Sequence, residues 1–418
     1  MIFDALTRQK EIYLNGISGT APLIPTDYLT LESKAQKKMS AKAYAYVAGG
    51  AGLESTLMEN VNAFSSYKIN PHMLQGSTSK NFTVRFLKQD FPVPIFLCPI
   101  GVLELVHPQA DLAVAEACKI TQIPMVVSNQ ASYPMEKIAQ ILNGNPWFFQ
   151  LYVSKMDELS FSFIRRAERA GAKGIIITLD TTLLGWRNRD LNLGYLPFLK
   201  GKGIAQYTSD PIFKKIADEW PMEKSSSKIN LKAILHLISL ALKIPGTFGE
   251  NIRGKALQTV RAFTQIYTRP DLNWDQIEKL KNGTSLPVIL KGIQRVDDAL
   301  KAISLGLDAI YISNHGGRQV DGAVASMEAL KNIRHHLPLD FPVLFDSGIR
   351  CGADIMKAKC LGANMIGIGR PYAYALALKG ATGVSELVKN LMSELELNMR
   401  LAGIHDINGL NVDHLSCA

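Results

Sequence analysis

The fold is decided most clearly by residues 287–313, PVILKGIQRVDDALKAISLGLDAIYIS. This stretch begins with a short apolar run, Pro287–Lys291, and ends with another, Ala309–Ser313. Runs this short and rich in Val and Ile are typical of strands that are buried on both faces. Between the two runs, Val296–Leu305 has apolar residues at helical spacing. The stretch therefore predicts two parallel strands joined by a helix.

The same unit recurs along the chain. Amphipathic segments that predict helices lie between the apolar runs, for example Asp111–Thr121, Asp157–Ala170 and Gly352–Leu361. The predicted strands are Pro94–Cys98, Pro124–Ser128, Trp147–Leu151, Gly174–Asp180, Pro287–Lys291, Ala309–Ser313, Pro342–Asp346 and Asn364–Gly369. Eightfold alternation of strand and helix predicts an α/β fold, a (β/α)8 TIM barrel. A doubly wound sheet is the alternative, but no fingerprint glycine loop follows the first strand.

Two segments fall outside the repeat, although the chain reads as a single domain over residues 1–418. Residues 1–93 form an N-terminal leader with helical pieces at Tyr28–Met39 and Ser55–Phe64, before the barrel at 94–380. A C-terminal helical tail is expected over 381–418. The connection 181–286, between the fourth and fifth strands, is several times longer than the others. Such long connections are typical of lids or binding insertions, so we expect a lid here.

Composition restricts the class of protein. The chain has 418 residues, 47% hydrophobic and 20% charged, which is a globular profile. The net charge is +9, but no block of five or six like charges appears, so nucleic-acid binding is not expected. A positive balance also suits an enzyme that binds carboxylates and phosphates.

Cysteine spacing and hydropathy predict the compartment. The five cysteines include no CxxC pair and no metal-type spacing, which indicates free thiols in a reducing compartment and no metal site. The start of the chain lacks the pattern of an export signal, and no apolar run is long enough to span a membrane. We therefore expect a cytoplasmic protein. The short apolar run Leu231–Ile244 predicts a packed lid helix, with a peripheral membrane or partner contact as the less favoured alternative.

Polar and ionisable residues gather where the predicted strands end, which is where barrel enzymes build their sites. Each one alone could be an ordinary loop residue, but the whole set predicts an active site. The set comprises Gly101, Ser128, Gln150, Tyr152, Thr178, Asp180, Lys291, Ser313 through Arg318, Asp346, Gly369 and Arg370.

The segment Ser313-Asn314-His315-Gly316-Gly317-Arg318-Gln319 is the sharpest motif. An imidazole has a pKa near neutrality and can accept a proton, and a guanidinium can hold a carboxylate through two hydrogen bonds. The glycines let the backbone turn, so His315 and Arg318 can converge on one small ligand. The alternative is a glycine-rich loop with a solvated histidine.

The ends of the last two strands predict a phosphate site. Asp346–Arg350 follows the seventh strand and Gly367–Arg370 ends the eighth, and barrels commonly bind phosphate at these loops. Lys291 ends the fifth strand and would be a fixed cation deep in the site. The alternative for Lys291 is a lysine whose amine reaches solvent.

These motifs, together with Tyr46–Gly52 and Phe149–Tyr152, resemble the FMN-dependent α-hydroxy acid oxidase and dehydrogenase family. The resemblance covers nearly the whole chain. Within the family, Ile177–Thr181 and Gly185–Leu191 are most similar to the lactate 2-monooxygenase subgroup.

The resemblance implies roles for the site residues. Tyr46 and Tyr152 would hydrogen-bond the substrate, and Arg187 and Arg318 would pair with its carboxylate. His315 would be the base, supported by Asp180, and Lys291 would stabilise negative charge on the reduced flavin. The residues implied in FMN binding are Pro99, Ile100, Gly101, Ser128, Gln150, Thr178, Lys291, Ser313, Asp346, Gly348, Arg350, Gly369 and Arg370.

The resemblance also implies a reaction, the oxidation of a small L-2-hydroxy acid to the 2-keto acid, with lactate favoured. Three outcomes share this scaffold: an oxidase that makes peroxide, a monooxygenase in which O2 also decarboxylates the product, and a dehydrogenase that reduces a quinone. Gly101, which has no Cβ, is expected to leave about one methyl group of room that would help to trap the keto acid. A homotetramer or larger homo-oligomer is implied. A barrel that binds flavin or phosphate without turnover is the alternative from another class.

Overall fold

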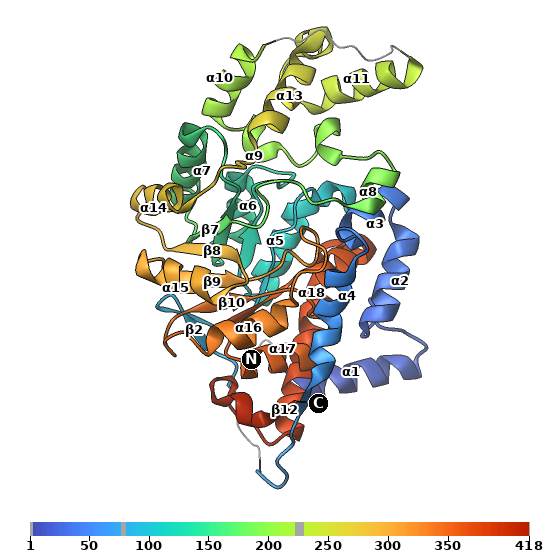
Figure 1. Ribbon diagram of the computed structural model, residues 1–418. Helices are drawn as coiled ribbons and strands as arrows, with labels where there is room; N and C mark the ends of the chain where they lie inside the picture. The colour runs from blue at the N-terminus through green and yellow to red at the C-terminus, as the bar shows by residue number, and fades with distance from the viewer. Residues whose placement is uncertain (1–2, 77–80, 222–229, 418) are drawn as a thin grey trace.

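Eight parallel strands close into a barrel at the centre of the molecule (Figure 1). The computed structural model describes residues 3–76, 81–221 and 230–417. Around the barrel the strand order is β10-β11-β4-β5-β6-β7-β8-β9. The strands are β4 (Ile95–Leu97), β5 (Met125–Val127), β6 (Trp147–Leu151), β7 (Ile175–Thr178), β8 (Val288–Ile293), β9 (Ala309–Ile312), β10 (Val343–Phe345) and β11 (Met365–Ile368). Each predicted run coincides with one of them, and the TIM barrel is confirmed.

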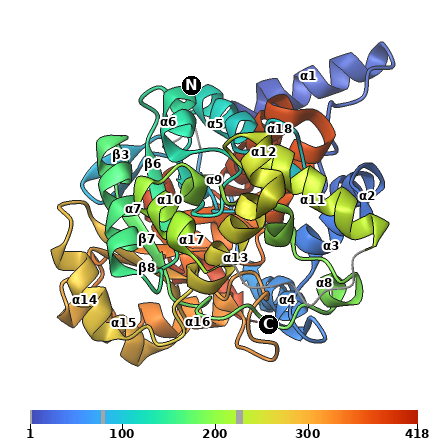
Figure 2. The same cartoon turned by 90° about the horizontal axis from the view of Figure 1, so that it is seen from above.

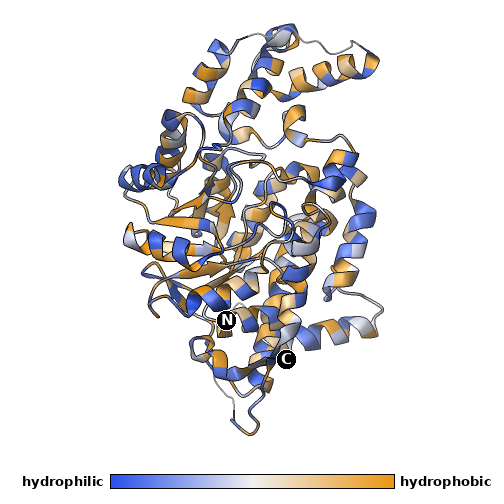
Figure 3. Ribbon diagram, viewed as in Figure 1, coloured by the Kyte–Doolittle hydropathy of each residue, from blue (hydrophilic) through white to orange (hydrophobic). Residues whose placement is uncertain are grey.

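The barrel strands are apolar because both of their faces are covered. In β7 every residue is buried, and Ile176 is in register with Ile289 of β8. Figure 3 shows the strands as a hydrophobic centre, whereas the surrounding helices alternate between hydrophobic and hydrophilic faces. This pattern is the one expected of strands that are enclosed by amphipathic helices.

Helices cover the outside of the barrel, and the four segments predicted in the repeat are confirmed to within one residue at each end. The outer helices are α5 (Ala110–Thr121), α6 (Met135–Leu142), α7 (Asp157–Arg169), α15 (Val296–Ser304), α16 (Ser326–Arg334), α17 (Gly352–Cys360) and α18 (Arg370–Leu401). The longest of them, α18, is broken at Lys379 and Gly380, where Gly380 has a φ of 58°.

The leader supplies helices beside the barrel and a short strand that meets the end of the chain. Its elements are α1 (Ala5–Ile17), α2 (Tyr28–Lys38), α3 (Ala41–Ala48), α4 (Ser55–Asn62), the 3-10 turn Ala63–Ser66, β1 (Tyr67–Ile69), and the pair β2 (Val84–Phe86) and β3 (Gln89–Phe91). Strand β1 pairs with β12 (Leu415–Cys417). The predicted helical tail is therefore helical only to Leu401, because the 3-10 turns Ile407–Gly409 and Val412–His414 and strand β12 follow it.

The connection between β7 and β8 lies over the carboxyl ends of the strands, as Figure 2 shows from above. It contains α8 (Asn188–Asn192), the 3-10 turn Pro197–Lys200, α9 (Ala205–Thr208), α10 (Pro211–Glu219), α11 (Leu231–Lys243), α12 (Phe248–Glu250), a π turn at Asn251–Lys255, α13 (Ala256–Ile266) and α14 (Trp274–Asn282). Tyr207 packs edge-on against Phe213 and Phe263, with ring centroids 5.4 and 4.7 Å apart. These buried rings give the connection an apolar centre that continues the main core.

Helix α11 contains most of the short apolar run noted in the sequence. Only Leu240 and Ala241 of this helix are buried, whereas Leu231, Leu235 and Leu242 are exposed. Helix α11 therefore packs along one side through Leu240 and Ala241, while its other apolar side chains are directed outward. Within the described ranges, no helix combines the length and the hydropathy needed to cross a bilayer.

Candidate active site

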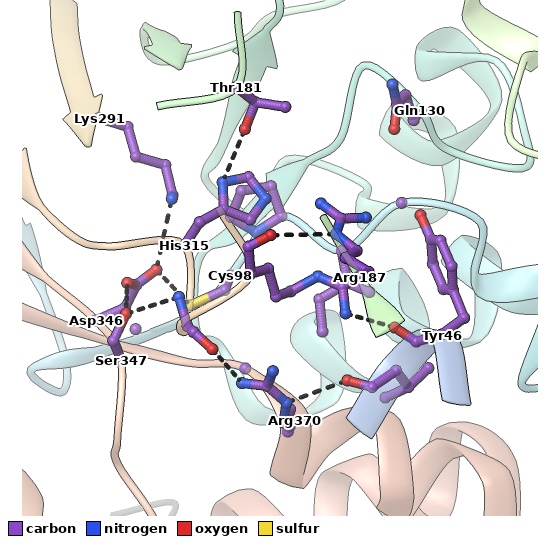
Figure 4. Close-up of a pocket in the computed structure, with 18 of the residues that line it drawn as sticks. Tyr46, Cys98, Gln130, Thr181, Arg187, Lys291, His315, Asp346, Ser347 and Arg370 are labelled. Carbon is purple, nitrogen blue, oxygen red and sulfur yellow. Dashed lines mark hydrogen bonds and ion pairs between the residues drawn. The ribbon is translucent and has the colours of Figure 1, made fainter. Parts of the chain in front are cut away.

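A pocket opens at the carboxyl ends of the barrel strands, beneath the β7–β8 connection (Figure 4). The pocket together with the solvent space at its mouth occupies about 1010 Å³. Most of the site residues predicted from the sequence line it: Tyr46, Pro99, Ile100, Gly101, Tyr152, Arg187, Lys291, His315, Arg318, Asp346, Gly348, Arg350, Gly369 and Arg370. The leader, the strand ends and the long connection thus contribute to one cavity.

His315 is fixed by the carboxylate of Asp180. The imidazole Nδ1 lies 2.7 Å from Asp180 Oδ1 and 3.1 Å from the hydroxyl oxygen of Thr181. Thr181 also donates to Asp180 Oδ1 at 2.9 Å. The backbone of His315 is left-handed, with a φ of 59°, and its N–H donates to Ser313 Oγ. With Nδ1 occupied, Nε2 is the ring nitrogen available to a ligand in the pocket.

Burial and charge decide the protonation of this pair. Burial lowers the pKa of His315, and the negative charge of Asp180 offsets only part of that effect. Burial alone would raise the pKa of Asp180, but the positive charges of His315 and Lys291 lower it well below its ordinary range. At neutral pH the pair is therefore a neutral imidazole beside an ionised carboxylate, which is the state of a general base.

Lys291 is a buried cation between two carboxylates. Its Nζ lies 3.7 Å from Asp180 Oδ2 and 4.0 Å from Asp346 Oδ2, and it donates to Ser313 Oγ at 2.9 Å. Burial disfavours its charge, but the two carboxylates outweigh that effect and the pKa of Lys291 is raised. The alternative of a lysine that reaches solvent is excluded, because the residue is only 3% exposed.

Arg187 and Arg318 both supply positive charge to the pocket. Arg318 donates to the carbonyl oxygens of Tyr46 and Gly49 at 2.5 and 2.9 Å, and Arg187 donates to the side-chain oxygen of Gln319 at 2.9 Å. Among the described residues, neither guanidinium forms a salt bridge. Burial, and then the charge of Arg187, lowers the pKa of Arg318 to about 9. Two such cations in one pocket favour an anionic ligand.

The loops after β10 and β11 form another part of the pocket wall. Gly348 has a φ of 96°, and a Cβ there would lie 2.0 Å from the carbonyl oxygen of Asn60, so only glycine fits. Gly369 precedes the first turn of α18, and a Cβ there would meet nothing within 4 Å. The buried Nε of Arg350 has no hydrogen-bond partner among the described atoms. An open helix N-terminus beside an unpaired guanidinium N–H suits a phosphate.

Arg370 lines the pocket and also holds backbone carbonyls. Its three guanidinium nitrogens donate to the carbonyl oxygens of Val47, Gly316 and Gly49 at 3.0–3.1 Å. Arg370 thus ties the leader to the His315 loop, as Figure 4 shows. These bonds leave two of its five N–H groups for a ligand.

Five predicted residues lie behind the pocket rather than on its surface. Ser128 donates to the side-chain oxygen of Gln150, whose amide nitrogen donates to Thr178 at 3.0 Å. Ser313 accepts a hydrogen bond from Lys291, and Asp180 contacts the ring nitrogen Nδ1 of His315. These hydrogen bonds fix the floor of the site.

Gly101 does not leave the free space expected from the sequence. A Cβ on Gly101 would lie 3.0 Å from Gln130 Cβ and 3.4 Å from its Oε1. The side chain of Gln130 therefore fills the space beside Gly101. This expectation was wrong because a glycine shows where a side chain is absent, but not which neighbour packs there.

Several lining residues were not identified as site residues by sequence reasoning. Thr181 adjoins a predicted strand end, and its hydroxyl next to Asp180 was the available signal. Leu184, Phe198 and Tyr267 come from the long connection and form an apolar wall. Phe198 and Tyr267 have ring centroids 5.8 Å apart. No local motif marks these residues, because their position depends on how the connection folds over the barrel.

Comparison with known proteins agrees with this geometry. The family model described as FMN-dependent dehydrogenase matches residues 35–417. An L-lactate oxidase of Lysinibacillus sphaericus is 33% identical over 404 residues, which are 97% of this chain and 96% of that protein. An FMN-dependent alpha-hydroxy acid dehydrogenase of Penicillium citrinum is 35% identical over 406 residues, 97% of this chain and 94% of the other.

The fold comparison gives the same family. A crystal structure of mandelate oxidase with (S)-4-hydroxymandelic acid superposes with a TM-score of 0.77 at 30% identity, covering 94% of this chain and 99% of the other. The cofactor named by the family also suits the residues present. The pocket contains an open helix N-terminus at Gly369, the unpaired Nε of Arg350 and the buried cation Lys291. The chain belongs to the family of FMN-dependent α-hydroxy acid oxidases and dehydrogenases, and its cofactor is FMN.

Proposed function

We propose that this protein oxidises a small L-2-hydroxy acid, with L-lactate as the favoured substrate, to the corresponding 2-keto acid. The observation that carries the proposal is the convergence of three groups on one pocket: the neutral imidazole of His315 and the guanidinium groups of Arg187 and Arg318, which form no salt bridge within the described part of the chain. A 2-hydroxy acid has a carboxylate for the arginines and, on the adjacent carbon, a hydroxyl group for the base.

In this proposal each residue has a role that follows from the chemistry of its side chain. Arg187 and Arg318 bind the carboxylate, and the phenol groups of Tyr46 and Tyr152 hydrogen-bond the substrate. His315 accepts a proton at Nε2 as the substrate is oxidised, and Asp180 stabilises the imidazolium that results. FMN, when bound, would take up the two electrons that the substrate loses together with its second proton.

The cofactor would be held from two ends. Gly348, Arg350, Gly369 and the free N–H groups of Arg370 would bind the phosphate. Lys291 would place its charge beside the end of the flavin where negative charge develops on reduction. The remaining flavin contacts would come from the backbone at Pro99–Gly101, from Asp346 and Ser313, and from the floor residues Ser128, Gln150 and Thr178.

The fate of the product is tested by incubating the purified protein with L-lactate under air and measuring acetate, pyruvate and peroxide in the same sample. Acetate that still forms when catalase removes free peroxide would show the monooxygenase outcome, in which O2 also decarboxylates the keto acid. Pyruvate with an equal amount of peroxide would show an oxidase. Pyruvate that forms only when a quinone is added would show a dehydrogenase. If no keto acid or decarboxylated acid forms under any condition, the proposed reaction is wrong.

A further inference from the structure

Three side chains from different strands meet inside the barrel, and two of them, Cys98 and Asp346, also line the pocket. Cys98 follows β4, Tyr311 is in β9, and Asp346 follows β10. The Tyr311 hydroxyl donates to Asp346 Oδ2 at 2.6 Å. Cys98 Sγ lies 3.4 Å from the Tyr311 oxygen and 3.5 Å from Asp346 Oδ2. Tyr311 and Cys98 are 0% and 6% exposed, so the cluster is buried.

The barrel wall leaves room for this cluster. Gly367 of β11 faces it, and a Cβ on Gly367 would lie 2.5 Å from Cys98 Sγ and 2.9 Å from the Tyr311 hydroxyl oxygen. The ring of Tyr311 also packs edge-on against Phe96, with centroids 5.5 Å apart. The phenol is therefore held in one position, with its hydroxyl directed at Asp346.

The same carboxylate lies close to Lys291 but does not hydrogen-bond it. Lys291 Nζ is 4.0 Å from Asp346 Oδ2 and 5.1 Å from the centroid of the Tyr311 ring. The other oxygen of Asp346 accepts a hydrogen bond from Ser347 at 2.8 Å. Without the Tyr311 hydroxyl, Oδ2 would be free to turn toward Lys291 and form a charge-assisted hydrogen bond of about 2.8 Å.

We propose that Tyr311 is a positioning residue that holds Asp346 away from Lys291 and thereby preserves the positive charge that Lys291 presents to the flavin. Cys98 supports the hydroxyl from the other side. Burial raises the pKa of both Tyr311 and Cys98 well above their ordinary values, so each keeps its proton at physiological pH. Tyr311 can then act as a permanent donor to Asp346.

The inference rests on the proposed placement of Lys291 beside the flavin, and it predicts an effect on the cofactor itself. A carboxylate that closes on Lys291 would cancel part of the charge that stabilises the reduced flavin. Hydrogen bonds to charged groups are strong enough to shift an equilibrium by about tenfold or more. For a two-electron couple, a tenfold shift corresponds to a reduction potential about 30 mV more negative.

The test is the reduction potential of FMN bound to the Tyr311→Phe holoenzyme, measured against a reference dye without substrate. Phenylalanine keeps the ring and removes only the hydroxyl. The matched control is Tyr67→Phe, because Tyr67 is also buried and donates to a carboxylate, Glu328, at 3.0 Å. We expect the potential to fall by about 30 mV in Tyr311→Phe and to stay at the wild-type value in Tyr67→Phe. The potential of Cys98→Ala should fall by less, because the contacts of the Cys98 sulfur are longer than the hydrogen bond between Tyr311 and Asp346.

Other outcomes would overturn the inference. An unchanged or more positive potential in Tyr311→Phe would show that the hydroxyl does not restrain Asp346. A Tyr311→Phe protein that fails to fold, or folds but does not retain FMN, would show that the hydroxyl is a structural group.

Lys291→Met separates this inference from the proposed function. If Lys291→Met leaves the potential unchanged, Lys291 is not beside the flavin and the proposed placement fails. If Lys291→Met lowers the potential but Tyr311→Phe does not, only the inference about Tyr311 fails. We expect the double variant to match Lys291→Met alone, because the effect of Tyr311 passes through Lys291.

Discussion

Asp180 holds His315 through a 2.7 Å contact between Oδ1 and Nδ1, while its other oxygen lies 3.7 Å from the amine of Lys291. That second oxygen, Oδ2, is buried and accepts no hydrogen bond from the described atoms. One carboxylate therefore supports both the base and the buried cation. This arrangement couples the protonation of His315 to the charge of Lys291.

Replacing Asp180 tests this coupling. In Asp180→Asn we expect flavin reduction by substrate to slow by about 10²-fold or more, because the imidazolium loses its counter-charge. The base must be neutral, so the wild-type rate should fall as the pH drops through the lowered pKa of His315, below about 6.5. Asp180 raises the pKa of His315, so this fall in rate, the acid limb of the pH profile, should move to lower pH in Asp180→Asn. Rapid-mixing measurements across pH would contradict the assignment if the limb moved to higher pH.

Neutralising the arginines should weaken the binding of carboxylates. Arg318→Met and Arg187→Met should each lower kcat/KM for the hydroxy acid by about tenfold or more, because each removes a charged hydrogen-bond donor. The control is Arg295→Met, since Arg295 pairs with Asp297 on the surface. Steady-state kinetics would count against the carboxylate site if both pocket variants retained the kcat/KM of the control.

The phosphate end can be tested without turnover. FMN should raise the unfolding temperature of the apoprotein, and riboflavin, which has no phosphate, should raise it less. Arg350→Met should reduce the difference between the two ligands, because the guanidinium of Arg350 would no longer meet the phosphate. Thermal denaturation at matched ligand concentrations measures both effects. An equal stabilisation by FMN and riboflavin in the wild type would place the phosphate elsewhere.

Glu104 joins the barrel to the long connection above it. Its carboxylate accepts a hydrogen bond from the backbone N–H of Gly203 at 3.1 Å and from the amine of Lys243 in α11 at 2.6 Å. Glu104→Gln should loosen this contact and make the connection more sensitive to limited proteolysis by at least a few fold. Glu116→Gln is the control, because Glu116 pairs with Lys119 in the same helix. Equal cleavage rates in the two variants would show that Glu104 does not hold the connection.

The sequence predicted those parts of the molecule that depend on local pattern. The barrel strands were visible because burial on both faces demands uninterrupted apolar runs, and the strand ends placed Lys291 and His315 in one site. Distant packing was not visible in this way. Arg370 was predicted as a ligand-binding group, but most of its donors hold backbone carbonyls, since the leader folds back over the His315 loop.

The outer wall of the pocket was the other feature that the sequence did not predict. Phe198 and Tyr267 come from a connection whose path across the barrel no periodicity reveals. Gln130 fills the space that Gly101 alone appeared to offer. Tyr311 was predicted only as part of an apolar strand. Its hydroxyl gained a partner because two other strands bring Asp346 and Cys98 to the same point.

The most direct test of the central claim is anaerobic reduction of the bound flavin by substrate. Purified holoenzyme should lose its yellow flavin absorbance when L-lactate is added without oxygen, and D-lactate should have little effect. His315→Gln should retain FMN and its absorbance but react about 10²- to 10⁴-fold more slowly, because the proton acceptor is missing. A wild-type flavin that stays oxidised with L-lactate and with other small L-2-hydroxy acids, or a His315→Gln variant reduced at the wild-type rate, would contradict the account.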